Sequence, residues 1–200
     1  MARQWPPLYN LRGGVQKGRA MAIGAVGGGS TGIDTPFSAA LTADDSLQAL
    51  ATVRNAIQIT SKMGPGQQVR VTFEASSAAD FSADNCSIGI LSGALGSGGA
   101  TVATPIELKF AGASGFAITA GQTITSDWAT LGGFVIGQYF EVIIDYAAIN
   151  GNPRKITTLG ATQAESCTKA ATNSYNSASA LVGGTTVAGQ LVGFNRIQVQ

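Results

Sequence analysis

The sequence predicts an all-β protein, an antiparallel β-sandwich of jelly-roll type that follows an extended N-terminal arm. Charged residues make up 12% of the chain, whereas roughly 25% is usual for a globular domain. Glycine accounts for 27 of the 200 residues, about twice its average usage. From about residue 47 onward, the chain contains segments in which apolar and polar residues alternate with a period of two, which is typical of strands with one buried face. Short strands joined by tight turns fit these three observations better than helices do.

The first 46 residues form the predicted arm. They contain Pro6-Pro7, Gly13-Gly14 and Gly27-Gly28-Gly29 and have no sustained period, which is typical of a linker. Residues 1–33 carry basic side chains and no acidic one. Because a plain spacer needs no aromatic residues, we expect the arm to become ordered against a partner. The expected contacts are Arg3, Trp5, Tyr9, Arg12, Lys17 and Arg19; a merely solvated tail is the alternative.

Residues 47–200 form the predicted sandwich. The first strand is expected at 53–59, and the stretch from Asp44 to Leu50 is either a short helix capped by Asp44 or Asp45 or the approach to that strand. Val69, Val71 and Phe73 then alternate with polar residues, so we expect them on a buried face. Further strands are expected at 86–90, 106–110 and 116–118.

The clearest alternation lies at residues 140–146. Phe140, Val142, Ile144 and Tyr146 are expected in the core, with Glu141 and Asp145 on a solvated face. The last strand is expected to place Leu191, Gly193, Asn195, Ile197 and Val199 on one side. Antiparallel strands with one solvated face stack as two sheets, which gives the sandwich.

Catalytic and metal-binding patterns are missing from the sequence. The chain has no histidine, which excludes Ser-His-Asp and Cys-His catalysis in the usual form and histidine-ligated zinc. The acidic pairs Asp44-Asp45 and Asp80/Asp84 lack the spacing of a calcium loop. Residues 13–20 lack the Lys-Ser/Thr of a phosphate-binding loop. We therefore expect a protein that is not an enzyme and has no catalytic, cofactor-binding or metal-binding residues.

The net charge and the hydropathy of the chain limit the classes of partner that it is expected to bind. The net charge of +1 argues against a nucleic-acid-binding function for the chain as a whole. No apolar run approaches the roughly 18 residues of a membrane span, and no secretory leader is recognised, so we expect no membrane partner.

Two further groups of residues leave alternatives open. Trp128 and Tyr139, together with Tyr146 and Tyr175, could form a carbohydrate-stacking surface or belong to the core or an interface. Cys86 and Cys167 are either two buried reduced thiols or a disulfide, which would stabilise the fold by about 4–5 kcal/mol.

Five segments between Gln68 and Ala147 resemble one known module. They are residues 69–74 (VRVTFE), 104–112 (TPIELKFAG), 116–121 (FAITAG), 125–128 (TSDW) and 140–144 (FEVII). Together they resemble the β-sandwich module that precedes the catalytic domain of many SGNH/GDSL-type esterases and recurs in phage proteins. The Gly-Asp-Ser and Asp-x-x-His motifs of those hydrolases are absent from this chain.

The resemblance implies a structural protein of a tailed-bacteriophage virion, as a capsid decoration, tail or fibre component. The arm would bind other virion proteins, and the sandwich would assemble with copies of itself or contact a host-surface glycan. The alternative is a carbohydrate-binding module that acts alone or as the accessory of an esterase.

Overall fold

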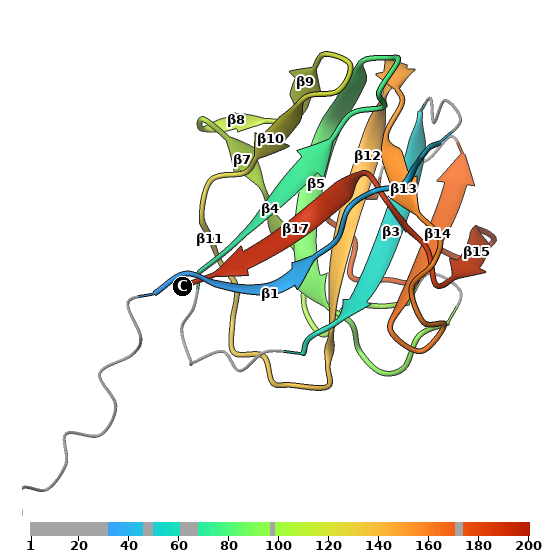
Figure 1. The fold of residues 1–200 in the computed structure, drawn as a ribbon. Coiled ribbons are helices and arrows are strands. Elements are labelled where there is room, and N and C mark those ends of the chain that lie inside the picture. Colours follow the sequence, from blue (N-terminus) through green and yellow to red (C-terminus); the bar gives the residue numbers. More distant parts are fainter. Residues whose placement is uncertain (1–31, 46–49, 61–67, 97–98, 171–173) are drawn as a thin grey trace, which may run out of the picture. The chain divides into compact units, whose positions relative to one another are not determined.

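The computed structural model describes residues 32–45, 50–60, 68–96, 99–170 and 174–200. The chain divides into two units, Met1–Ser30 and Thr31–Gln200, and the described residues all belong to the second. Every regular element in them is a β-strand, and all named strand pairs are antiparallel. The two largest sheets pack face to face (Figure 1), so the predicted antiparallel β-sandwich is confirmed.

One layer is a five-stranded sheet with β1 at its edge, and β17 and β4 form its middle. Its members are β1 (Asp34–Ser38), β17 (Phe194–Val199), β4 (Gln68–Glu74), β10 (Thr123–Thr125) and β11 (Ala129–Thr130). On β4, Val69, Val71 and Phe73 are fully buried, as their alternation with polar residues predicts.

The other layer is a seven-stranded sheet whose two longest strands, β12 and β5, lie next to each other (Figure 1). Its members are β15 (Thr185–Ala188), β14 (Ala164–Ala170), β3 (Ala51–Gln58), β12 (Tyr139–Gly151), β5 (Phe81–Ile90), β6 (Ile106–Glu107) and β9 (Phe116–Ile118). The strand expected at 53–59 is β3, which begins two residues earlier than expected.

Two small sheets accompany the two large ones. One consists of β16 (Leu191–Val192), β13 (Arg154–Ile156) and β2 (Ala43–Asp44), and the other of β7 (Lys109–Phe110) and β8 (Ala113–Ser114). Asn55 of β3 ties the first of these to the large sheet. Its buried amide accepts a hydrogen bond from Val192 N at 2.9 Å and donates one to Val192 O at 3.0 Å.

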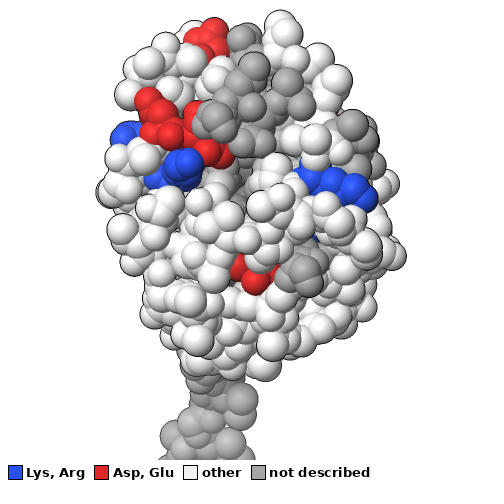
Figure 2. Space-filling view, turned by 90° about the vertical axis from the view of Figure 1, so that its right-hand side faces the viewer, with Lys and Arg blue, Asp and Glu red and all other residues white. Residues whose placement is uncertain are grey.

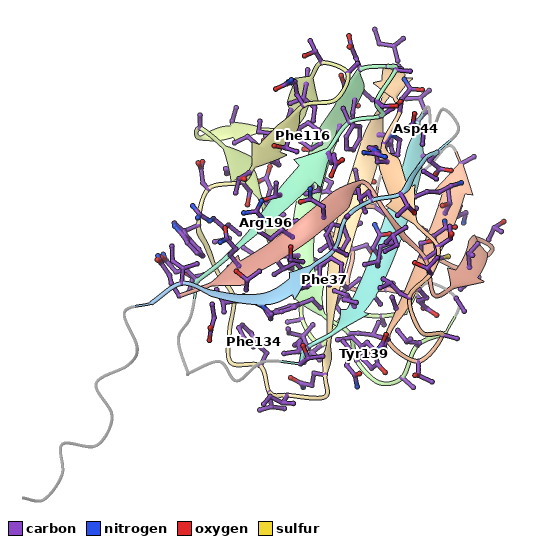
Figure 3. The ribbon with its side chains drawn as sticks, in the orientation of Figure 1. Phe37, Asp44, Phe116, Phe134, Tyr139 and Arg196 are labelled. Carbon is purple, nitrogen blue, oxygen red and sulfur yellow. The ribbon has the colours of Figure 1, made fainter. Side chains whose placement is uncertain are left out.

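A cluster of aromatic rings joins the two layers at one end of the sandwich, where Figure 3 labels Phe116. The ring of Phe116 lies 4.8 Å from Phe81 of β5, 5.1 Å from Phe73 of β4 and 4.9 Å from Phe110 of β7. Tyr146 of β12 stacks on Phe81 at 5.5 Å. Aromatic rings at these separations stabilise the fold by more than the burial of their apolar area alone, so the cluster determines how the two layers pack.

The boundary of the arm needs correction, because β1 and β2 lie in the stretch that the sequence assigned to residues 1–46. The strand β1 pairs with β17, and Phe37 packs on Phe194 with 5.7 Å between the ring centres. The register shifts between Asp34 and Phe37, and Pro36 lies on this edge strand. A short edge strand with a bulge and a proline has no alternation to detect.

The predicted helix around Asp44 is also absent from the described residues. Asp44 ends strand β2, and Leu50 is in a turn with a positive φ of 50°. Residues 46–49 lie outside the described residues. Of the two alternatives for this stretch, the approach to the strand β3 fits what is described.

The expected face of the last strand is wrong at Asn195. A register shift between Phe194 and Arg196 marks a bulge in β17, and Phe194 is fully buried while Asn195 is not. Because a bulge inserts one extra residue into a strand, the residues before it and those after it no longer follow the same inward and outward alternation. The side chain of Asn195 instead donates a hydrogen bond to Glu74 at 2.6 Å.

Candidate functional site

Four charged residues share the outer face of the seven-stranded sheet, the face turned away from the core. Arg54 of β3 lies opposite Ile143 of β12, and residues opposite each other on paired strands point to the same face. Glu141 and Asp145 are two residues before and after Ile143, so they share that face with Arg54. Glu165 of β14 lies opposite Ala56 and therefore joins them. The alternate residues of β3, Val53 and Ile57, face the core.

These four side chains are buried, which contradicts the expectation that Glu141 and Asp145 lie on a solvated face. Arg54 and Glu141 are each 1% exposed, and Asp145 and Glu165 are almost as inaccessible. The physical reason is a second layer of backbone over the sheet. We call it the cover; it comprises residues 91–96, 99–105 and 174–184. Alternation along a strand reveals its two faces but not what lies over each of them, so this burial had no signal in the strand itself.

Arg54 is the centre of the contacts between the sheet and the cover. Its guanidinium donates hydrogen bonds to the carbonyl oxygens of Gly99 at 3.0 Å, Ser177 at 2.7 Å and Ser174 at 3.4 Å. One of its nitrogens lies 3.5 Å from a carboxylate oxygen of Glu141. The cover has two halves in sequence, the residues that follow β5 (91–96 and 99–105) and residues 174–184. The side chain of Arg54 binds both halves, because the planar guanidinium can donate to several acceptors at once.

Carboxylates bind the cover through its amide groups. Asp145 accepts hydrogen bonds from the backbone N of Tyr175 at 3.0 Å and of Ser174 at 3.3 Å, and from the hydroxyl of Thr52. Glu165 accepts one from the backbone N of Gly96 at 3.0 Å. Hydrogen bonds with one charged partner are roughly twice as strong as neutral ones, so these bonds partly offset the cost of burying the carboxylates.

Small residues let the cover approach the sheet. A Cβ at Gly89, on β5 opposite Glu141, would lie 2.8 Å from the methyl group of Thr101. A Cβ at Gly184 would lie 2.5 Å from the sulfur of Cys167 on β14. A backbone hydrogen bond of 3.0 Å from Thr101 N to Ala178 O joins the two halves of the cover.

Burial dominates the acidity of the carboxylates beneath the cover. It raises the pKa of Glu141 to about 7; the nearby Arg54 opposes the rise, and the charge of Glu165 adds to it. Burial also raises the pKa of Asp145, against the hydrogen bonds from Thr52, Tyr175 and Ser174. Because desolvation disfavours the charged form, Glu141 gains or loses its proton near neutral pH rather than near pH 4.

An apolar pocket of about 200 Å³ lies beside the cover, between it and the loop after β11. Its walls are mostly aliphatic side chains and glycines: Gly89, Ile90, Val102, Ala103, Thr104, Ile106, Leu131, Gly132, Gly133 and Gln138. Val102 is 66% exposed and Ile106 38% exposed at its rim. The neighbouring turn presents Val135 and Ile136, also well exposed.

No charged residue occurs in either stretch of sequence that builds this pocket, 85–106 and 128–140. The charged residues that flank the stretches are Asp84, Glu107, Asp127 and Glu141. We call the four large aliphatic residues that these two stretches expose (Val102, Ile106, Val135 and Ile136) the apolar surface. Exposed apolar groups that cluster without charge differ from the scattered ones on every protein surface.

Elsewhere the charged side chains gather in small groups, as the largely white face in Figure 2 shows. On the three-stranded sheet, Arg154 binds Glu74 at 3.0 Å and Asp44 at 3.5 Å, and Lys155 binds Asp45 at 2.7 Å. Hydrogen bonds from the backbone and hydroxyl of Ser77 lower the pKa of Asp44. The acidic pair Asp44-Asp45 thus fixes neighbouring segments.

The described residues contain no group of three or more His, Cys, Asp or Glu that could hold a metal ion.

The aromatic residues expected at a glycan surface do not form one row. Trp128 precedes β11 at the five-stranded sheet and packs against Arg70, whose guanidinium carbon lies 4.4 Å from the ring centre. Tyr139 begins β12 in the other sheet and donates a hydrogen bond to Thr162 O at 2.9 Å (Figure 3). Tyr146 belongs to the core, and Tyr175 is part of the cover. Glycan contact by Trp128 and Tyr139 stays a prediction.

The two cysteines are free and buried, so of the two alternatives the reduced thiols are confirmed. Cys86 of β5 lies opposite Ile144 of β12, a core residue, whereas Cys167 of β14 lies opposite Arg54 of β3. The thiols are therefore on opposite faces of the sheet, with two strands between theirs. Strand spacing alone separates them by roughly 14 Å, far beyond the reach of a disulfide.

The expected contacts of the arm, Arg3, Trp5, Tyr9, Arg12, Lys17 and Arg19, lie outside the described residues. The part of the chain that the structure describes contains no helix long and apolar enough to cross a membrane. No family model matches the chain, and no curated protein matches its sequence. The resemblance to the esterase and phage module therefore stays a prediction.

Proposed function

We propose that this chain is a non-enzymatic structural module of a bacteriophage virion, which assembles with copies of itself through the apolar surface. The observation that carries the proposal is a pocket built from two charge-free stretches: exposed Val102 and Ile106 line it, and the stretch that supplies its other wall also exposes Val135 and Ile136. Interface cores are depleted of charged residues, and exposed aliphatic groups in such a setting are usual at contacts between proteins.

The rest of the described unit supports a scaffold role. Its outer polar face is closed by the cover, and the polar groups of Arg54, Asp145 and Glu165 are used to bind that cover. A net charge near zero weakens the repulsion between copies. The assignment to a phage particle, as a decoration, tail or fibre component, comes from the sequence resemblance. The arm, which corresponds to the unit Met1–Ser30, would then bind neighbouring virion proteins.

The proposal is tested by the mass of the purified full chain as a function of concentration. Light scattering is compared for the wild-type chain and for Ile136→Asp, which introduces a charge at a residue that is 58% exposed. We expect oligomers from the wild type and a shift to monomer in the variant, because an unpaired charge in an apolar contact is costly.

The matched control is Ile149→Asp. Ile149 is 69% exposed, at the far end of β12 from the apolar surface, so the same substitution should leave the oligomer intact. A wild-type chain that is monomeric at all concentrations would contradict assembly through copies of itself. Equal loss of the oligomer in both variants would contradict the role of the apolar surface.

A further inference from the structure

Several of the hydrogen bonds that attach the cover to the sheet are made by buried charged side chains. Arg54 binds three backbone carbonyls of the cover, Asp145 binds two of its amides, and Glu165 binds one. Glu141 binds no group of the cover in the described contacts; its partner is Arg54 itself. Protonation of Glu141 therefore changes the charge beside Arg54 without removing a bond to the cover.

Charged groups on four strands, β3, β12, β14 and β6, share the face of the sheet on which Glu141 lies. Arg54 lies on β3, Asp145 on the same strand as Glu141, and Glu165 and Lys169 on β14. Across β5, Glu107 of β6 shares the face but pairs with Lys109 at 2.7 Å. The cover adds Tyr175, and the thiol of Cys167 also faces this side. Beneath the cover, the carboxylates of Glu141, Asp145 and Glu165 thus outnumber the guanidinium of Arg54.

We propose that Glu141 is a proton-binding site that couples the cover to pH: the closed cover favours a proton on Glu141, and loss of that proton favours an opened cover. The inference uses only the contacts of the sheet with the cover and does not depend on the proposed assembly function. It concerns the described segments 91–96, 99–105 and 174–184.

The direction follows from solvation. Beneath the closed cover Glu141 has a pKa of about 7, because burial disfavours its charge, against an ordinary value of 4.5. When the cover opens, water reaches the carboxylate and its pKa returns toward that ordinary value. Between these two values the closed form holds a proton that the opened form lacks. Lowering the pH from 8 to 5 should therefore stabilise the closed form, by a factor on the order of 100 in the closed-to-open ratio.

Amide hydrogen exchange of the full chain tests this coupling. The amides of Gly96, Thr101 and Tyr175 bond to Glu165, Ala178 and Asp145 and report on the cover. After correction for the intrinsic effect of pH, their protection should fall on the order of 100-fold from pH 5 to pH 8. It should remain below that of the core amide of Val142, because the cover opens without global unfolding.

Two variants sharpen the test. Glu141→Gln, which resembles the protonated residue, should lose the pH dependence, whereas Glu107→Gln, at a half-buried carboxylate of the same sheet, should keep it. If the glutamine variant does not fold, NMR titration of the Glu141 carboxyl in the wild-type chain replaces it, and an apparent pKa near 4.5 would overturn the proposal. Cover amides that exchange only as slowly as Val142, or protection that does not change with pH, would also overturn it.

Discussion

The stability of the whole chain should fall as the pH rises from about 4.5 to about 7, the opposite of ordinary acid denaturation. Glu141 has a folded pKa of about 7 and an ordinary value of 4.5, so the folded state binds the proton more tightly than the unfolded state. The stabilisation is complete below pH 4.5 and is lost as the pH rises through 7. A difference of 2.5 pKa units, at 1.36 kcal/mol each, corresponds to about 3 kcal/mol.

The pH range from about 4.5 to about 7 is favourable for the measurement because the chain has no histidine, the side chain that ordinarily titrates between pH 5 and 8. Asp145, whose pKa is also raised by burial, acts in the same direction. The lowered pKa values of Asp44 and Glu107 act in the opposite direction, but their contribution is lost only at more acidic pH. A change in stability near neutral pH thus reports on the carboxylates beneath the cover.

The assay is urea unfolding at pH 5, 6, 7 and 8 for the wild-type chain and for Glu141→Gln. The free energy of unfolding of the wild type should decrease by about 3 kcal/mol across this series, and that of the variant should change much less. A wild-type free energy that is constant or rises with pH would refute the reasoning. So would a variant with the full wild-type pH dependence.

Three further predictions concern single side chains. Arg54→Met should lower the free energy of unfolding at pH 8 by about 3–5 kcal/mol, because it leaves a buried carboxylate and three carbonyls without their donor; a loss below about 1 kcal/mol would contradict this. Phe116→Ala should cost about 3–5 kcal/mol in urea unfolding, since the ring contacts three other aromatic rings; a near-neutral effect would show that the cluster does not join the layers. Cys86 and Cys167 should react with a thiol reagent only after denaturation, without prior reduction; an absence of reactive thiols in the denatured chain would indicate a disulfide.

Local alternation was sufficient to predict the strands that form the core. On β4, Val69, Val71 and Phe73 face the other sheet as the pattern requires, and on β12 Phe140, Val142 and Ile144 do the same. Such positions are determined by the period of the strand and by the preference of apolar groups for the interior. The sandwich as a fold class follows from several strands of this kind.

Features that depend on distant segments could not be predicted in this way. Glu141 and Asp145 alternate with core residues as solvated residues would, and they are buried because the cover, from remote parts of the chain, lies over them. The bulge before Arg196 moves one residue out of the alternation, and the edge strand β1 is too short to show any. The apolar surface was likewise missed, although the charge-free stretches 85–106 and 128–140 could have indicated it.

The central claim is that the chain is an assembly module, and light scattering combined with electron microscopy of the purified full chain tests it most directly. The same measurement on a chain that lacks residues 1–30 separates the contribution of the arm. We predict symmetric oligomers of the full chain, weakened or rearranged when the arm is removed. Compact monomers from both chains, at every concentration tested, would contradict the claim.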